Sequence, residues 1–297
     1  MDAMQFGGHL PVFGPAATRD TILAFARRME ALGYDSLWAS DHVVVPWDIT
    51  SKYPYSATGD FPFPAGADFL EPFTVLAAVA GVTERVLLGT SVLVVPHRHP
   101  LLAAKIAATL DRMAPGRIVL GVGVGWMREE IELLGAPFER RGAWTDEAIR
   151  VMRACWTPGD RTSFSGEFFR FNDLGCFPKP AAGTIPIWIG GHTPAAFRRV
   201  ARVGDGWHAA FPTSDAAVAD LARLRDACRA AKRDPATITI SARVGYAARR
   251  PSDEVLAEIK RLRDHGVTHV ILETRMRDLQ DLTAIYERFA QDVRPRL

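Results

Sequence analysis

Residues 85–100 read RVLLGTSVLVVPHRHP, and this stretch decides the interpretation of the 297-residue chain. Residues 86–88 form a short apolar run bounded by turn signals, which is typical of a fully buried strand. Gly89, Thr90 and Ser91 interrupt that run, and a glycine within a strand often marks a bulge or a close approach of backbone to a ligand. The pattern fits a barrel strand whose carboxyl end lines a site. A buried strand that leaves through a proline-rich turn is the plainer alternative.

Strand-like segments recur along the chain, and a helical pattern follows each of them. We predict strands at 4–10, 35–40, 86–95, 117–122, 185–189, 205–211, 237–244 and 268–272. Helices are predicted at 19–32, 70–82, 101–113, 128–134, 143–156, 215–231, 252–264 and 279–293, and after Pro194. Eight strand–helix units predict an α/β fold, a (β/α)8 TIM barrel that takes up residues 1–297 as one domain. A doubly wound open sheet is the alternative.

Two segments depart from this alternation. Residues 157–184 contain a hairpin-like stretch, SFSGEFFRF at 163–171, and then a leader rich in proline and glycine. Because the alternation resumes afterwards, we interpret 157–184 as an insertion between the fourth and fifth strands. Residues 43–68 form a long connection rich in proline, glycine and aromatic residues. A connection of this length inside a compact domain is usually a lid or binding loop.

The composition is that of an ordinary globular enzyme, with 48% hydrophobic residues, 24% charged residues and a net charge of +2. This balance gives no basic field that would favour nucleic acid as a partner. The sequence contains no apolar run of about 18 residues, so no membrane span is predicted. The sequence starts without a secretory signal pattern, so we expect a cytoplasmic protein. Cys155, Cys176 and Cys228 lack metal-site spacing and are expected to be buried thiols in a reducing compartment.

Chemistry-bearing residues follow several of the predicted strands. The carboxyl ends of barrel strands meet on one face, where active sites lie. That face would receive Asp41, His42, Thr90, Ser91, His97, Arg98, His99, Gly123, Gly125, Trp126, Gly190, Gly191, His192, Thr193 and His208. The set holds bases, hydrogen-bond donors and glycine backbone, but no credible metal-ligand set. His42 can act as an acid or base near neutral pH, although a satisfied structural histidine is the plainer alternative.

Residues 190–194, GGHTP, have the features of an anion site at a helix start. Two glycines leave backbone N–H groups unshielded, Thr193 can cap the helix, and Pro194 suits its first position. The N-terminus of the helix would then present donors and a positive dipole end to a phosphate. An ordinary glycine turn with a helix cap is the alternative.

Residues 121–125, GVGVG, are not a dinucleotide fingerprint, because the third glycine of G-x-G-x-x-G is missing. No acidic residue follows at the position of a ribose contact. We interpret these glycines, Gly123 among them, as a surface on which a flat ring can lie. Plain tolerance of close packing is the alternative.

Together these motifs resemble the luciferase-like monooxygenase superfamily of flavin- and coenzyme F420-dependent oxidoreductases. The resemblance rests on the order and spacing of five stretches, namely LWASDH at 37–42, LGTSV at 88–92, LGVGVGW at 120–126, PIWIGG at 186–191 and GDGW at 204–207. It covers nearly the whole chain. These stretches are specific for the superfamily and much less so for any substrate.

The resemblance implies a barrel with one insertion, commonly a homodimer, and a cofactor across the carboxyl face. The cofactor phosphate would lie near Gly190 and Gly191, and its ring near strands two to four. Deazaflavin-using members carry a non-prolyl cis peptide at the third strand, and the matching bond is Ser91–Val92. The bulge there would press on the middle ring of the cofactor, so the resemblance implies that Ser91 and Val92 bind the cofactor. The histidine that matches His42 is the base in sugar-phosphate dehydrogenases of that group.

The resemblance also implies residues on the substrate side. Trp47 would match a tryptophan that lines the substrate pocket, with a one-residue difference in loop length. Those enzymes carry a glutamate directly after the glycine-rich run, where this chain has Trp126, so its proton-donor role is vacant and sugar-phosphate activity is not carried over. Arg98 and Arg128 are candidates for an outer channel that would hold the polyglutamate tail of F420.

Three functions remain open from the sequence. The first is an F420-dependent enzyme that moves hydride to or from an unknown small organic substrate. The second is an FMN-dependent monooxygenase that obtains reduced flavin from a partner reductase. The third is a non-catalytic barrel that stores or senses a flavin. The aromatic, proline-rich loop at 43–68 suggests an apolar or cyclic substrate.

Overall fold

Eight parallel strands close into a barrel in the computed structural model, which describes residues 4–56, 58–210, 214–274 and 279–297. Around the barrel the order is β1-β10-β9-β8-β7-β4-β3-β2, and β1 pairs with both β2 and β10. The strands are β1 (Gln5–His9), β2 (Ser36–Ala39), β3 (Leu87–Val94), β4 (Ile118–Gly123), β7 (Ile187–Gly190), β8 (Gly206–Ala210), β9 (Thr239–Gly245) and β10 (His269–Glu273). The (β/α)8 barrel is confirmed over the open sheet. Phe211, the last residue of the predicted sixth strand, lies outside the described residues.

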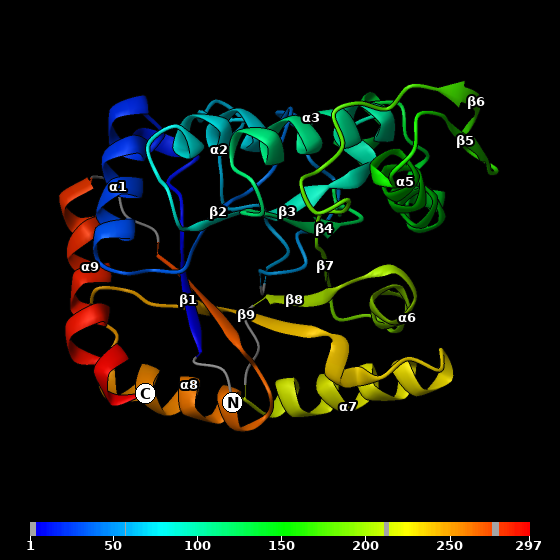
Figure 1. The fold of residues 1–297 in the computed structure, drawn as a ribbon. Coiled ribbons are helices and arrows are strands. Elements are labelled where there is room, and N and C mark those ends of the chain that lie inside the picture. Colours follow the sequence, from blue (N-terminus) through cyan, green and yellow to red (C-terminus); the bar gives the residue numbers. More distant parts are fainter. Residues whose placement is uncertain (1–3, 57, 211–213, 275–278) are drawn as a thin grey trace.

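Helices surround the strands (Figure 1). They are α1 (Arg19–Ala31), α2 (Pro72–Ala80), α3 (Pro100–Met113), α4 (Arg128–Leu133), α5 (Arg141–Trp156), α6 (Pro194–Val203), α7 (Ser214–Ala230), α8 (Ser252–Asp264) and α9 (Leu279–Asp292). Short 3-10 helices are η1 (Gly14–Ala16), η2 (Val95–His97), η3 (Phe138–Arg140), η4 (Pro235–Thr237) and η5 (Arg294–Arg296). Helix α1 illustrates the local rules: the Thr18 side chain accepts a hydrogen bond from the Thr21 amide at its start, and Gly33 follows its end at φ +78°.

The third strand passes through its polar residues without a break. Its pairing with β4 shifts register between Thr90 and Leu93, and the Ser91–Val92 peptide bond is cis. Gly89 is required by the packing, because a Cβ atom there would lie 2.3 Å from the Trp38 ring. The interruption in the sequence therefore marks an irregularity inside the strand rather than its end.

Rings fill the inside of the barrel below its carboxyl face. The Trp38 ring lies 5.3 Å from Trp188 and 5.1 Å from His208, centroid to centroid, and its edge meets His269. His269 also contacts the Ser36 hydroxyl at 2.7 Å. This packed layer closes the barrel interior, so a ligand reaches the strand ends from one side.

The segment between β4 and β7 carries an antiparallel pair, β5 (Thr162–Ser165) and β6 (Arg170–Leu174), outside the barrel beside α5 (Figure 1). The Glu147 carboxylate of α5 accepts hydrogen bonds from three consecutive amides of the connecting turn, those of residues 167–169. One buried carboxylate thereby fixes the hairpin to the helix that precedes it.

Three smaller expectations can be compared with the structure. Cys155 and Cys228 are buried, but Cys176 is only partly buried, because it lies in the exposed leader that follows the hairpin. Within the described residues, no helix is both long and apolar enough to cross a membrane. The same residues contain no group of three or more His, Cys, Asp and Glu side chains suited to a metal ion.

Candidate active site

A cavity of about 730 Å³ opens at the carboxyl ends of the barrel strands. This volume is within the range of sites that hold cofactors and small ligands. Ten predicted site residues line it, namely Asp41, His42, Ser91, Val92, Gly123, Trp126, Gly190, Gly191, His192 and Thr193. The fold therefore brings together segments that lie 150 residues apart in the sequence.

Two predicted site residues lie elsewhere. Thr90 is fully buried, and its hydroxyl donates a hydrogen bond to the Gly121 carbonyl oxygen at 2.8 Å, which turns it toward β4 instead of the cavity. Trp47 is 83% exposed and is not among the residues that line the cavity. Its interpretation as a substrate-pocket residue is wrong, because its part of the loop points outward and other aromatic residues of the loop line the cavity.

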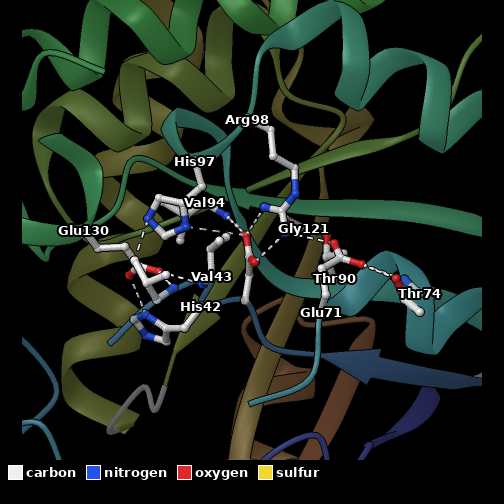
Figure 2. Close-up of polar contacts among 12 residues, drawn as sticks. His42, Val43, Glu71, Thr74, Thr90, Val94, His97, Arg98, Gly121 and Glu130 are labelled. Atoms are coloured by element: carbon white, nitrogen blue, oxygen red, sulfur yellow. Dashed lines mark hydrogen bonds and ion pairs between the residues drawn. The ribbon is translucent and has the colours of Figure 1, made fainter. Parts of the chain in front are cut away.

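His42 is held by Glu130, a residue of α4 that is fully buried. The His42 Nδ1 atom lies 2.7 Å from Glu130 Oε2 (Figure 2). The other carboxylate oxygen accepts hydrogen bonds from the amides of Val43 and Val44, at 2.6 and 3.1 Å. One side chain thus fixes both the ring of His42 and the backbone that carries it.

The Glu130 carboxylate is kept ionised by these contacts. Burial alone would raise its pKa, but the hydrogen bond from His42 and the nearby His97 ring hold the pKa below its usual value. An ionised carboxylate can only accept hydrogen bonds, so the proton of the pair belongs on His42 Nδ1. His42 Nε2 then carries the lone pair, on a ring that lines the cavity.

A second ion pair, formed by Asp41 and Arg98, lies near this one, and Figure 2 labels Arg98. Asp41 accepts two hydrogen bonds from the Arg98 guanidinium, at 2.7 and 2.8 Å, and one from the Val94 amide. Arg98 also binds Glu71 at 2.8 Å. Asp41 borders the cavity, but its oxygens are engaged by Val94 and Arg98, so its role is to tie the end of β2 to the end of β3.

His97 fills the space between the two carboxylates. Its ring nitrogens lie 3.5 Å from Glu130 and 3.9 Å from Asp41. Burial lowers the pKa of His97, which these anions only partly offset. Its Nδ1 atom is buried without a hydrogen-bond partner. His97 therefore lies between the two buried carboxylates and keeps them apart.

Neither arginine proposed for an outer channel is suited to it. Arg98 is engaged by Asp41 and Glu71, as described above. Arg128 pairs with Glu132 and Glu139 on the surface. Their positive charge alone suggests a role in binding the polyglutamate tail. Only the fold shows that each of them has carboxylate partners.

Glu130 is the functional residue that sequence reasoning missed. It lies in the predicted helix 128–134, whereas the resemblance points to position 126, directly after the glycine run, for an acidic residue. Glu130 comes four residues after Trp126, about one helical turn later, and α4 turns its side chain back to the end of β2. The signal was the pair Glu129-Glu130 at the start of a short helix next to the predicted site.

The far end of the cavity has the predicted features of an anion site. Thr193 caps α6 by accepting a hydrogen bond from the Ala196 amide at 3.2 Å, and Pro194 occupies the first turn. Gly191 has φ +105°, a conformation that favours glycine. Bare backbone and a helix N-terminus therefore face the cavity together.

An apolar strip joins the two ends of the cavity. A Cβ atom at Gly123 would lie 2.8 Å from the Val92 side chain, and one at Gly190 would lie 3.3 Å from it. Glycine at both positions leaves Val92 uncovered toward the cavity. The strip thus offers an apolar surface beside the glycines, and residues 190–193 line the same cavity.

The amino-acid sequence matches known proteins along its length. The family model for luciferase-like monooxygenases matches residues 4–294. The chain belongs to the luciferase-like monooxygenase family. An uncharacterized protein from Mycobacterium tuberculosis is 36% identical over 257 residues, which cover 86% of this chain and 85% of that protein.

Another relative and two solved structures of similar fold carry names that describe chemistry. An F420-dependent glucose-6-phosphate dehydrogenase from Nakamurella multipartita is 36% identical over 198 residues, covering 66% of this chain and 52% of that protein. An F420-dependent secondary alcohol dehydrogenase in complex with an F420-acetone adduct has a TM-score of 0.79 at 20% identity, covering 96% and 98% of the two chains. The monooxygenase RslO1 from Streptomyces bottropensis has a TM-score of 0.76 at 22% identity, covering 99% of each chain. The two structures support the fold.

Proposed function

We propose that this protein is an oxidoreductase that transfers hydride between coenzyme F420 and a small organic substrate. The observation that carries the proposal is one cavity with a carboxylate-held histidine at one end and a glycine-lined helix start at the other. The F420-dependent names of several relatives support the choice of cofactor.

The residues of the cavity suit such a cofactor. The bare amides of Gly190 and Gly191 and the capped start of α6 would hold its phosphate. Val92 and Gly123 would support its ring. When bound, the deazaflavin supplies a two-electron centre that accepts or gives hydride.

His42 would manage the proton that accompanies this hydride. For an alcohol substrate, the carbinol C–H bond breaks with its electron pair leaving as hydride, and the hydroxyl proton passes to His42 Nε2. A carbonyl group is formed. In the opposite direction His42 returns the proton to the carbonyl oxygen. Glu130 keeps Nδ1 protonated in the resting state and stabilises the imidazolium that forms.

Side-by-side titration with F420 and FMN, followed by fluorescence, tests the cofactor. We expect F420 to bind in the micromolar range and FMN much more weakly. FMN binding without F420 binding would favour the two-component monooxygenase instead. If neither binds below about millimolar, where the binding free energy is only about 4 kcal/mol, both proposals fail.

Replacement of the base tests catalysis separately. His42→Ala should keep F420 affinity within a few-fold, because the phosphate end of the cavity is untouched, while turnover falls by about 10²–10⁴. A wild-type protein that binds F420 but turns over with no donor or acceptor would favour the storage or sensing barrel. The homodimer and the cytoplasmic location stay predictions.

A further inference from the structure

An aromatic cage surrounds His42 on the side of the cavity away from the phosphate end. We define the cage as Tyr53, Phe61, Phe63, Phe69 and Trp126, all of which line the cavity. The first four come from the long loop after β2 and its continuation, and Trp126 from the end of the glycine run. The sequence predicted a binding loop but did not indicate which of its rings turn inward.

The cage lies directly against the proposed base. The ring centroids of Phe61 and Phe69 are 4.9 and 5.1 Å from that of His42, and the centroid of Trp126 is 6.2 Å away. The Phe61 ring also packs on Trp126 at 5.2 Å. A substrate that reaches His42 is therefore in contact with ring faces and edges.

The charges of the cavity do not suit an anionic substrate at this end. Glu130 is an ionised carboxylate in contact with His42, and a substrate phosphate would be repelled by it. Arg98, the cation nearest in the network, is saturated by Asp41 and Glu71 and is not among the residues that line the cavity.

The cationic side chains that do line the cavity have partners or are exposed. Arg141 donates to the carbonyl oxygens of Gly125 and Phe138. Arg199 pairs with Asp146, and Arg243 with Glu273. Lys52 is exposed and lies against Gly59 in the loop. Among these four, Lys52 is thus the exposed cation that a phosphorylated substrate would recruit first.

We infer that the substrate is an uncharged apolar or cyclic alcohol, or the corresponding carbonyl compound, held by the aromatic cage over His42. This inference rests on the proposed function, and it excludes a sugar phosphate. The reaction balances as described above: the carbinol C–H bond gives hydride to F420, the hydroxyl proton goes to His42, and the C=O bond forms.

Ligand-observed saturation-transfer NMR on the F420-loaded protein tests the binding step, with cyclohexanone and glucose 6-phosphate as probes. We expect saturation transfer to cyclohexanone and none to glucose 6-phosphate. Cyclohexanol should also reduce F420 in a spectrophotometric assay, whereas glucose 6-phosphate should not.

Three variants locate the probe. Phe61→Ala should weaken cyclohexanone binding about tenfold, because it removes the ring nearest His42. Trp47→Ala removes a larger ring from the same loop but outside the cavity, and should change this affinity less than twofold. Lys52→Gln should also leave cyclohexanone binding unchanged.

The outcomes separate this inference from the proposed function. Loss of F420 binding in the wild type would overturn the proposed function itself. If F420 binds but glucose 6-phosphate gives the saturation signal, and Lys52→Gln abolishes it, the substrate inference fails while the cofactor assignment stands. F420 binding with no signal from either probe would also overturn the inference, because the cage would then not accept a small apolar ring.

Discussion

At the scale of single residues, the function proposed for His42 depends on which of its two nitrogens carries the proton. Glu130 decides this, because its buried carboxylate faces Nδ1. The neighbouring Glu129 turns the other way and binds Thr50 and Ser51 of the same loop. Both acids therefore hold the loop, Glu130 at residues 43–44 and Glu129 at residues 50–51, but only Glu130 also contacts His42.

This difference gives a matched pair of variants. Glu130→Gln can present an amide N–H group to His42 Nδ1, which favours the tautomer with the proton on Nε2 and removes the base from the cavity. We expect turnover to fall by about 10²–10⁴, with F420 affinity unchanged. Nitrogen-15 NMR of the imidazole should show the change of tautomer directly.

Glu129→Gln is the control, because it alters loop anchoring without contacting His42. It should keep the wild-type tautomer and most of the turnover. Equal losses of turnover in the two variants, with the His42 nitrogen shifts unchanged, would mean that Glu130 serves only to anchor the loop.

At the scale of elements, the sequence of β3 reflects its two neighbours, the Trp38 ring and the cavity. Gly89 gives room to Trp38 inside the barrel, and Val92 faces the cavity within the register shift. The same strand thus packs the barrel interior in its first half and lines the site in its second. This explains why its sequence mixes small, polar and apolar residues.

A glycine-to-alanine pair tests the packing of β3. Gly89→Ala should reduce the free energy of unfolding by about 1–3 kcal/mol, since its Cβ atom would lie within 2.4 Å of two Trp38 ring carbons. Gly245→Ala in β9 meets no atom within 4 Å and should change it by less than about 1 kcal/mol. Urea unfolding of both variants measures the difference, and similar values would argue against a tight fit at Gly89.

The sequence predicted the elements well and the side-chain contacts less well. Alternating apolar runs and helical periodicity are local signals, so the eight strands and the Thr193 cap could be predicted. Thr90 and Trp47 could not be placed, because the direction of a side chain at an irregular strand or in a long loop depends on tertiary packing. Glu130 was missed for the same reason: its partner lies 88 residues away.

At the scale of the whole molecule, the barrel interior contains buried histidines that stay uncharged. Burial, with a smaller contribution from Arg243, lowers the pKa of His9 to about 4, and burial lowers that of His269 to about 3. The ordinary value is 6.5. The unfolded chain therefore binds protons at mildly acidic pH that the folded barrel does not.

This difference in proton binding decides whether the folding stability rises or falls with pH. Stability should be complete above about pH 7 and should fall as the pH drops through 6.5 toward 4, by an order of 2 kcal/mol for each of these histidines at pH 5. Glu130 has a lowered pKa, so the stability that its ionised form contributes is lost only below about pH 4.5. Urea unfolding at pH 7, 6 and 5 measures how steeply the free energy of unfolding changes with pH. His269→Asn should lower the number of protons taken up on unfolding by about one. A free energy of unfolding that is constant from pH 7 to 5 would contradict this account.

The ion triad of Asp41, Arg98 and Glu71 has a consequence for how such a protein can change. Asp41 and Glu71 stand at the two ends of the long loop, and one guanidinium holds both of them. The two ends of the loop are thus held together by one side chain that lies outside the loop. Segments of other lengths and ring content could be grafted between those two anchors with the barrel left intact, and new specificities could be obtained by exchanging one contiguous piece of the gene.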